Sequence, residues 1–158
     1  MTAAEGTFVR HTMSVDAPQE KAFEVFTDSL DDWWPRSHKI GAEPLERAVL
    51  EAGEGGRWYE RDTDGSECDW GKVLVFEPPG RLVLTWQINA EWKFDPDLSR
   101  ASEVEVRFTE VNGQTTVDFE HRHIERLGAG AAELARSVGS PDGWPGILDL
   151  YAKAAAAA

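Results

Sequence analysis

Cysteine is almost absent from the sequence, which contains Cys68 and no second cysteine. An internal disulfide is therefore excluded, and the chain fits a reducing compartment. Positive charge is also scarce, because 16 Lys and Arg residues stand against 29 Asp and Glu residues and leave a formal net charge of −13. A phosphate backbone or an anionic membrane surface would repel such a protein. We expect no nucleic-acid partner and no membrane partner.

Long apolar segments are missing as well. No stretch approaches the roughly 18 apolar residues that cross a membrane, and the opening segment MTAAEGTFVRHTMSV lacks the apolar run of a signal peptide. We therefore expect a cytoplasmic protein. A chain of 158 residues has the size of one domain. We expect that domain to span residues 1–158, with a frayed tail at 153–158.

Tryptophan is what the sequence has in excess. It contains seven Trp and seven Phe, and 41% of its residues are hydrophobic, which favours a globular chain with a core. Trp70 and Trp86 lie near the outer ends of DWGKVLVFEPPGRLVLTWQI, which indicates two strands joined by a Pro-Pro-Gly turn. Rings on neighbouring strands either fill a core or line a cavity. A function in ligand binding requires that they line a cavity.

Apolar spacing predicts the order of the elements. Residues 8–15 alternate as a strand, Asp16-Ala-Pro18 opens a helix, and a short second helical piece ends before Pro35. Six further strands are expected at 45–51, 57–61, 102–111 and 115–124 and, as a pair, within 69–88, with Asn112-Gly113 as a hairpin turn. Helical spacing returns at 127–138, breaks at 139–143 and resumes from about Pro145.

This order predicts an α+β fold. Hairpin signals indicate a sheet of six or seven strands, mostly antiparallel, with one apolar face. The terminal helix is the element long enough to cover that face. Two short helices are expected after the first strand.

The register of the central hairpin stays open at this stage. If Glu77 pairs with Arg81, Trp70 shares a face with Trp86, whereas pairing of Glu77 with Leu82 puts Trp70 on the opposite face. A slip of one residue turns every side chain of a strand to the other face. Trp86 is expected inside in either case.

Six segments in order resemble a known family. They are AFEVFTDSLDDWW, GGRWYERDTDG, WGKVLVFEPPGRLVLTW, SEVEVRF, VDFEHR and GWPGILDLYA. The chain resembles homologues of the activator of heat-shock protein 90 ATPase, in the START and birch-pollen-allergen-like (SRPBCC) superfamily, from about residue 8 to residue 152. The resemblance implies a helix-grip fold, in which a curved antiparallel sheet wraps a long C-terminal helix with a cavity between them. It supplies no catalytic residue.

The expected inner face is aromatic with a few polar groups, as in many ligand cavities. The residues expected to bind a ligand are Trp34, Trp58, Glu60, Trp70, Trp86, Phe108, Phe119, His121, Trp144 and Leu148. In this arrangement the two polar members, Glu60 and His121, orient the polar end of the ligand.

Two other kinds of chemistry fit the same residues. His121-x-His123 has a spacing that can chelate a metal with help from Glu60 or Asp69, but a metal-free pair at a strand end explains it equally. Glu60 and His121 could form an acid–base pair, or Glu60 could belong to a structural ion pair. We expect no metal and no cofactor.

The predicted function is binding of a small apolar or aromatic molecule between the sheet and the terminal helix, without catalysis. One alternative is a cyclase, dehydratase or hydrolase that uses the same cavity. A second is a chaperone-interaction module that activates an ATPase. The expected partners are a small apolar ligand and a second copy of the chain in a homodimer, with a chaperone as the alternative.

Overall fold

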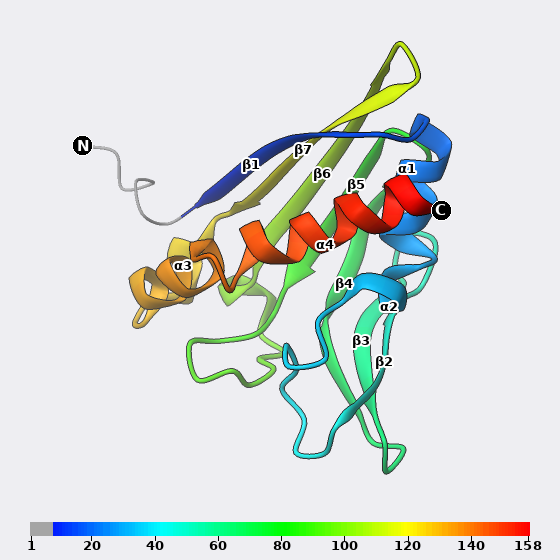
Figure 1. The fold of residues 1–158 in the computed structure, drawn as a ribbon. Coiled ribbons are helices and arrows are strands. Elements are labelled where there is room, and N and C mark those ends of the chain that lie inside the picture. Colours follow the sequence, from blue (N-terminus) through cyan, green and yellow to red (C-terminus); the bar gives the residue numbers. More distant parts are fainter. Residues whose placement is uncertain (1–7) are drawn as a thin grey trace, which may run out of the picture.

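Seven strands form one antiparallel sheet in the order β1-β7-β6-β5-β4-β3-β2. They are β1 (Val9–Val15), β2 (Leu45–Leu50), β3 (Arg57–Asp62), β4 (Glu67–Glu77), β5 (Arg81–Trp86), β6 (Ser102–Val111) and β7 (Gln114–Arg122). The computed structural model describes residues 8–158. Its sheet is strongly curved and turns its concave face to the last helix (Figure 1), which confirms the helix-grip prediction.

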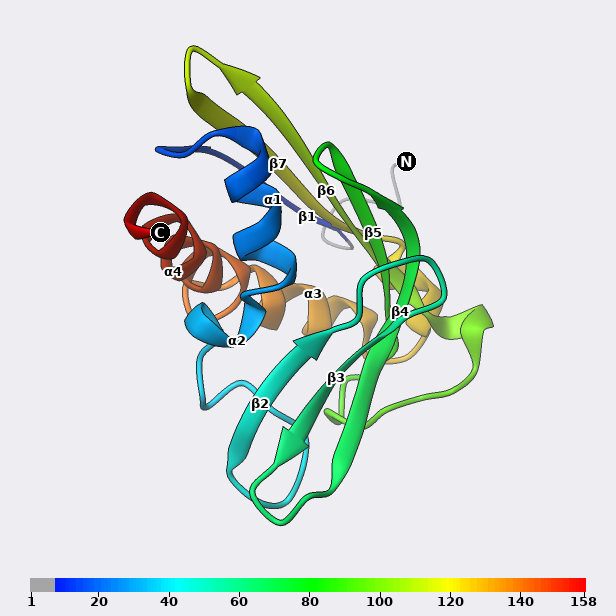
Figure 2. The same ribbon diagram turned by 90° about the vertical axis from the view of Figure 1, so that its right-hand side faces the viewer.

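The helices α1 (Gln19–Thr27), α2 (Leu30–Trp33) and α4 (Trp144–Ala157) lie on that concave side, as Figure 2 shows. The chain also forms α3 (Ala131–Gly139) and the 3-10 turns η1 (Leu98–Arg100) and η2 (Ile124–Leu127). The break between α3 and α4 falls at the predicted Gly-Ser-Pro-Asp-Gly segment. The terminal alanines expected to fray are helical as far as Ala157. Within residues 8–158, no helix is long and apolar enough to span a membrane.

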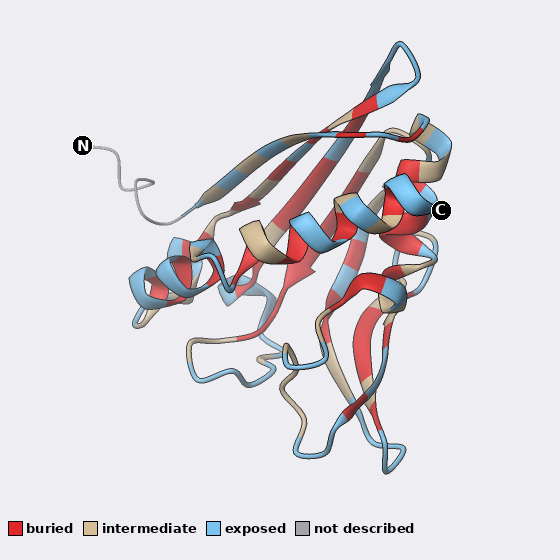
Figure 3. Cartoon of the chain, viewed as in Figure 1, coloured by how far each residue is buried: buried red, intermediate tan, exposed pale blue. Residues whose placement is uncertain are grey.

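The second half of α4 lies on a solid core. Tyr151 is fully buried, and its hydroxyl donates to the Ala22 carbonyl at 2.7 Å. Its ring contacts that of Phe26, which in turn contacts Phe108 on the sheet. Figure 3 shows buried residues on the facing sides of α4 and the sheet. This packing fixes α4 across the sheet and leaves the start of the helix near the ends of β4 and β5.

Strand β4 follows neither of the two continuous registers considered from the sequence. Glu77 pairs with Arg81, as in the first register, but the ladder shifts between Val73 and Val75. Leu74 is left on the outside with 43% of its surface exposed. A β-bulge adds one residue to a strand and thereby reverses the faces beyond it.

A second shift brings Trp70 back inside. On the other edge of β4, Trp58 pairs with Gly71 while Tyr59 pairs with Asp69, so Trp70 is the extra residue. Its side chain is 2% exposed and faces the interior beside Trp58. The two irregularities together place Trp70 on the inner face, as the first register predicted. The hairpin pattern in the sequence did not predict the irregularities themselves.

Candidate functional site

A cavity of about 460 Å³ opens between the sheet, the start of α4, and the loops that follow α2 and β5. We call it the tryptophan cavity, because five indole rings line it. They are Trp34 after α2, Trp70 on β4, Trp86 on β5, Trp92 in the loop after β5, and Trp144 at the start of α4. Its aliphatic wall is formed by Ile40, Ile88, Val138 and Ile147.

Four of these rings are fixed in place by their own N–H groups. Trp34 donates to the His38 carbonyl and Trp86 to the Ile88 carbonyl, both at 2.8 Å. Trp70 donates to Glu60 at 3.0 Å and Trp144 to Nδ1 of His121 at 3.1 Å. The indole N–H groups are therefore used by the protein itself. What these four rings offer a ligand is their apolar faces and edges.

The rings also hold one another. Trp34 stands 5.0 Å from Trp70 and 6.0 Å from Trp144 between ring centroids, and Trp86 stands 5.8 Å from Trp144. Trp92 is the outermost ring, 44% exposed, on a left-handed backbone with φ of 61°. A preorganised wall of this kind loses little conformational entropy when a ligand arrives.

The polar side of the cavity comes from residues that we did not predict. His38 lies in the loop after α2, with Nε2 2.6 Å from the Asp142 carbonyl and Nδ1 3.0 Å from the Ser37 hydroxyl. Lys39 donates from Nζ to the Gly41 carbonyl at 2.6 Å. The feature of the sequence that could have suggested them is their position shortly after Trp34-Pro35, where the second helix was predicted to end.

Of the ten residues predicted to bind a ligand, four line the cavity: Trp34, Trp70, Trp86 and Trp144. The other six lie behind it or beyond it, which corrects the sequence-based placement. They are Trp58, Glu60, Phe108, Phe119, His121 and Leu148. Phe108 packs with Phe23 and Phe26 in the solid core beneath α4. Leu148 is fully buried one turn beyond the lining residue Trp144.

Trp58 and Phe119 support the wall from behind. The Trp58 indole donates to the Thr85 carbonyl at 2.8 Å, and its ring contacts the ring of Trp86. Phe119 packs on Trp144 with 4.5 Å between ring centroids. The alternation on their strands correctly predicted that both side chains face inward, but a second layer of aromatic rings lies between them and the cavity.

Glu60 is completely buried and holds part of the cavity wall. It accepts hydrogen bonds from the backbone N–H groups of Ile40 at 2.6 Å and Gly41 at 3.0 Å, besides that from Trp70. Burial by itself would raise the pKa of Glu60, but the adjacent Asp62 carboxyl and these hydrogen bonds lower it. Burial and the neighbouring Glu60 raise the pKa of Asp62 to about 6.

His121 is also completely buried. Because Nδ1 accepts the Trp144 N–H, the neutral ring carries its proton on Nε2, which donates to the Ser102 hydroxyl at 2.8 Å. Burial lowers the pKa of His121 to about 3. Within residues 8–158, no hydrogen bond joins His121 to Glu60, so the acid–base pair is not formed.

The His121-x-His123 pair does not present two imidazoles on one strand face. β7 ends at Arg122, and His123 follows with a left-handed φ of 62°. Its Nδ1 lies 3.6 Å from Glu125 on a half-exposed surface. The end of the strand therefore separates the two rings that strict alternation would have brought together.

Comparison with known proteins gives a family and two close relatives. The family model described as "Activator of Hsp90 ATPase homolog 1-like protein" matches residues 16–154. The structure of Txn09, described as an anthrahydroquino-gamma-pyrone synthase complexed with SUM, is 39% identical with a TM-score of 0.66. That match covers 92% of this chain and 95% of Txn09.

CalC from Micromonospora echinospora, described as a self-sacrificing resistance protein, is 37% identical with a TM-score of 0.68, over 94% of this chain and 93% of CalC. Protein NE0264 from Nitrosomonas europaea has a TM-score of 0.68 at 15% identity, over 98% of this chain and 97% of its own, and shows the shared fold alone. No curated protein matches the sequence significantly.

Proposed function

The chain belongs to the family of activator of Hsp90 ATPase homolog 1-like proteins, and from this premise we propose that it binds a small, flat aromatic molecule in the tryptophan cavity. The observation that carries the proposal is the wall of five indole rings, four of which have their N–H groups bonded to protein acceptors. Such a wall recognises a ligand by stacking and by exclusion of water.

The size of the cavity supports this class of ligand. Sites for small molecules usually enclose about 300 to 1,000 Å³, and the tryptophan cavity measures about 460 Å³. The Lys39 ammonium on its polar side has three N–H groups, of which one donates to Gly41, and it favours a ligand with an acceptor or an anionic group at one end. The names of Txn09 and CalC, a synthase and a resistance protein, support a small-molecule role for this kind of domain.

Binding can be measured through the tryptophans themselves. We expect naphthalene, anthracene and anthraquinone sulfonates to quench the intrinsic fluorescence saturably, with one molecule bound per chain in calorimetry. Ser137 lines the cavity from α3 and is exposed, so Ser137→Trp fills the opening and lowers affinity at least tenfold. Arg136→Trp, on the same helix but outside the lining, is the matched control.

Two results would contradict the proposal. One is the absence of saturable binding for the whole series of sulfonates. The other is equal affinity of the Ser137→Trp and Arg136→Trp proteins, because binding would then occur elsewhere on the surface.

A second proposed function is catalysis in the same cavity, and the position of His38 favours it. This ring lines the cavity and has one nitrogen beside the Ser37 hydroxyl, whereas Glu60 and His121 are sealed behind the tryptophans. A general acid or base must reach its substrate within hydrogen-bond distance. If the protein is an enzyme, His38→Gln keeps aromatic binding and abolishes turnover, while His121→Gln leaves turnover measurable.

A further inference from the structure

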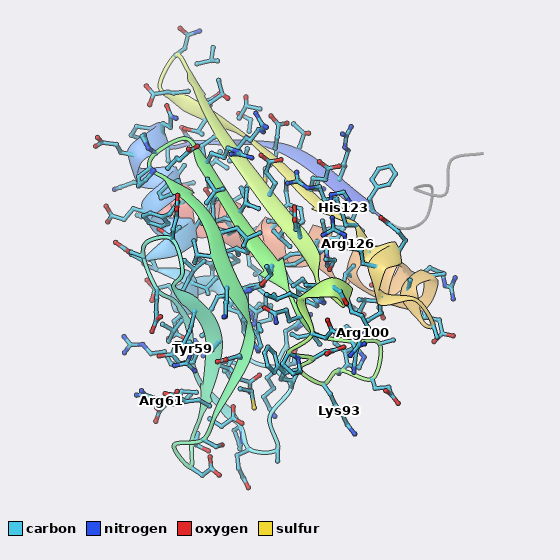
Figure 4. The ribbon with its side chains drawn as sticks, turned by 180° about the vertical axis from the view of Figure 1, so that it is seen from behind. Tyr59, Arg61, Lys93, Arg100, His123 and Arg126 are labelled. Atoms are coloured by element: carbon cyan, nitrogen blue, oxygen red, sulfur yellow. The ribbon has the colours of Figure 1, made fainter. Side chains whose placement is uncertain are left out.

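A second cluster of reactive side chains lies on the β3–β4 hairpin, behind the tryptophan cavity. Glu60 pairs with Cys68 across the ladder, and Asp62 follows Glu60 on the same face. The alternating residues Tyr59 and Arg61 lie on the outer face of the sheet, the face seen in Figure 4. One ligand atom from each of Glu60, Asp62 and Cys68 falls within 4.8 Å of the other two. The backbone register itself therefore gathers these groups.

Asp62 is the unsatisfied member of this cluster. Its side chain is completely buried, and among residues 8–158 neither carboxylate oxygen has a hydrogen-bond partner. The Gly41 backbone covers it so closely that a Cβ at that position would lie 1.8 Å from Oδ2 of Asp62 and 2.8 Å from Oε2 of Glu60. Two adjacent buried carboxylates cannot both stay ionised without compensation. A proton or a cation must stand between them.

We propose that Glu60, Asp62 and Cys68 form a binding site for a borderline divalent cation of the Zn²⁺ class. Zinc accepts carboxylate oxygens and thiolate sulfur together, whereas magnesium and calcium take oxygen ligands. Neighbouring ligands in a tetrahedral zinc site stand about 3.5 Å apart. Closing the present spacing to that value requires rotation of the Asp62 and Cys68 side chains. The fourth position is left to water.

Glu60 has the hydrogen bonds that orient a metal ligand. Its Oε1 accepts from Ile40 and Trp70, while its Oε2 accepts from Gly41 and from no second donor in the described part of the chain, so it keeps a lone pair that a cation can use. Such outer contacts fix the position of a ligand carboxylate and tune its affinity. The Trp70 contact also links the site to an optical reporter, because a cation on Glu60 changes the surroundings of that indole.

The cation can reach the site from solvent. Cys68 is half-buried and lines a surface groove together with Trp92 and Phe94 from the loop after β5. Arg57 in the same groove is bonded to Asp69 at 2.6 Å, so its charge is already compensated. Lys39 opposes binding by its charge, which its hydrogen bond to the neutral Gly41 carbonyl does not remove. Burial raises the pKa of the Cys68 thiol, so binding must release a proton.

Titration of the untagged full chain with Co²⁺ and Zn²⁺ tests the proposal. We expect one equivalent of Co²⁺ to produce a thiolate-to-cobalt charge-transfer band near neutral pH, a change in tryptophan emission, and displacement of Co²⁺ by Zn²⁺. Cys68→Ser removes the band, and Asp62→Asn weakens binding at least tenfold. Asp64→Asn, exposed in the turn of the same hairpin and bonded to Ser66, keeps wild-type affinity and is the matched control.

Three results would contradict the proposed site. They are the absence of a charge-transfer band, an unchanged Co²⁺ affinity in Asp62→Asn, and an unchanged Co²⁺ affinity in Cys68→Ser. If Asp62→Asn stabilises the fold while no metal binds to the wild type, a shared proton alone compensates the two carboxyls and the proposal fails. Circular dichroism confirms that each variant is folded, so loss of binding is not loss of structure.

Discussion

The neighbours of each tryptophan ring decide its role in this protein. Trp58 is 2% exposed, lies outside the cavity lining, and is surrounded by Trp34, Trp70 and Trp86. Trp86 is 7% exposed and has one side on the cavity. Both residues are tryptophans on the same concave face, yet Trp58 packs in the core whereas Trp86 lines the cavity.

Truncation to alanine should separate these roles. Trp58→Ala is expected to lower the free energy of unfolding by about 3–5 kcal/mol, as large buried aromatics do. Trp86→Ala is expected to cost about 1–2 kcal/mol less, because part of its ring contacts open space instead of protein. Urea unfolding of both variants measures the difference. Equal losses would show that Trp86 is packed on all sides.

His121 should make stability depend on pH. Its pKa falls from 6.5 to about 3 on folding, so the unfolded chain binds the proton more tightly. This contribution to stability is complete above pH 6.5 and declines as pH falls toward 3, by about 1.4 kcal/mol per pH unit. Between pH 6.5 and about pH 5, the wild type should lose about 2 kcal/mol more than His121→Gln.

The His121→Gln variant isolates the titration of the ring from its hydrogen bonds. Gln at position 121 can still accept from Trp144 and donate to Ser102, so the comparison removes the titration and keeps both contacts. Parallel slopes for the wild type and His121→Gln would contradict the prediction.

Strand β4 shows what a single element contributes to the cavity wall. Its two irregularities turn Trp70, Val73 and Phe76 inward although they are three residues apart. Gly71 makes the irregularity at Trp70 possible. A Cβ there would lie 1.9 Å from the Thr85 carbonyl oxygen and 2.5 Å from Nε1 of Trp58.

Gly71→Ala is therefore expected to be severe. The added methyl group would force β5 and Trp58 apart and break the Trp58 hydrogen bond to Thr85, at a cost of about 3 kcal/mol or more. Gly80→Ala, in the turn between β4 and β5, meets its nearest atom at 3.7 Å and should change stability by less than about 1 kcal/mol. Thermal unfolding of the two variants compares them, and similar midpoints would refute this explanation of the bulge.

Over the whole molecule, α4 divides the interior into two halves. Its second half rests on packed rings through Tyr151, and its first half, from Trp144 to Ile147, borders the tryptophan cavity. The packed core beneath the second half of α4 holds the helix in place, and the first half of the same helix forms one wall of the cavity. The proposed ligand would therefore meet a preformed site, and its binding should raise the melting temperature without a large change in circular dichroism.

The co-chaperone activity in the family name is expected to be absent or minor for residues 1–158. The proposed site is an interior cavity, whereas activation of an ATPase requires a surface that binds the chaperone. A coupled ATPase assay with purified heat-shock protein 90 measures the effect. Clear stimulation at low micromolar concentration of this protein would overturn the expectation and favour a surface function.

The sequence by itself determined the elements and their order. Alternation with a period of two placed Val104, Val106 and Phe108 on one face of β6, and the 3.6-residue period predicted α1 and α4. These patterns are local, because each residue takes its side from its near neighbours along the chain. The same logic put Trp86 inside, and the structure agrees.

Tertiary structure alone decided which of the inner residues meet the cavity. Its lining joins the loop after α2, the ends of β4 and β5, and the start of α4, segments that are far apart in the chain. His38 lines it, while Glu60 and His121 lie one aromatic layer behind. The bulges in β4, and the Gly41 backbone that covers Asp62, likewise depend on contacts between distant segments. Periodicity says which face of an element is buried, whereas a cavity is the space that several such faces leave unfilled when they meet.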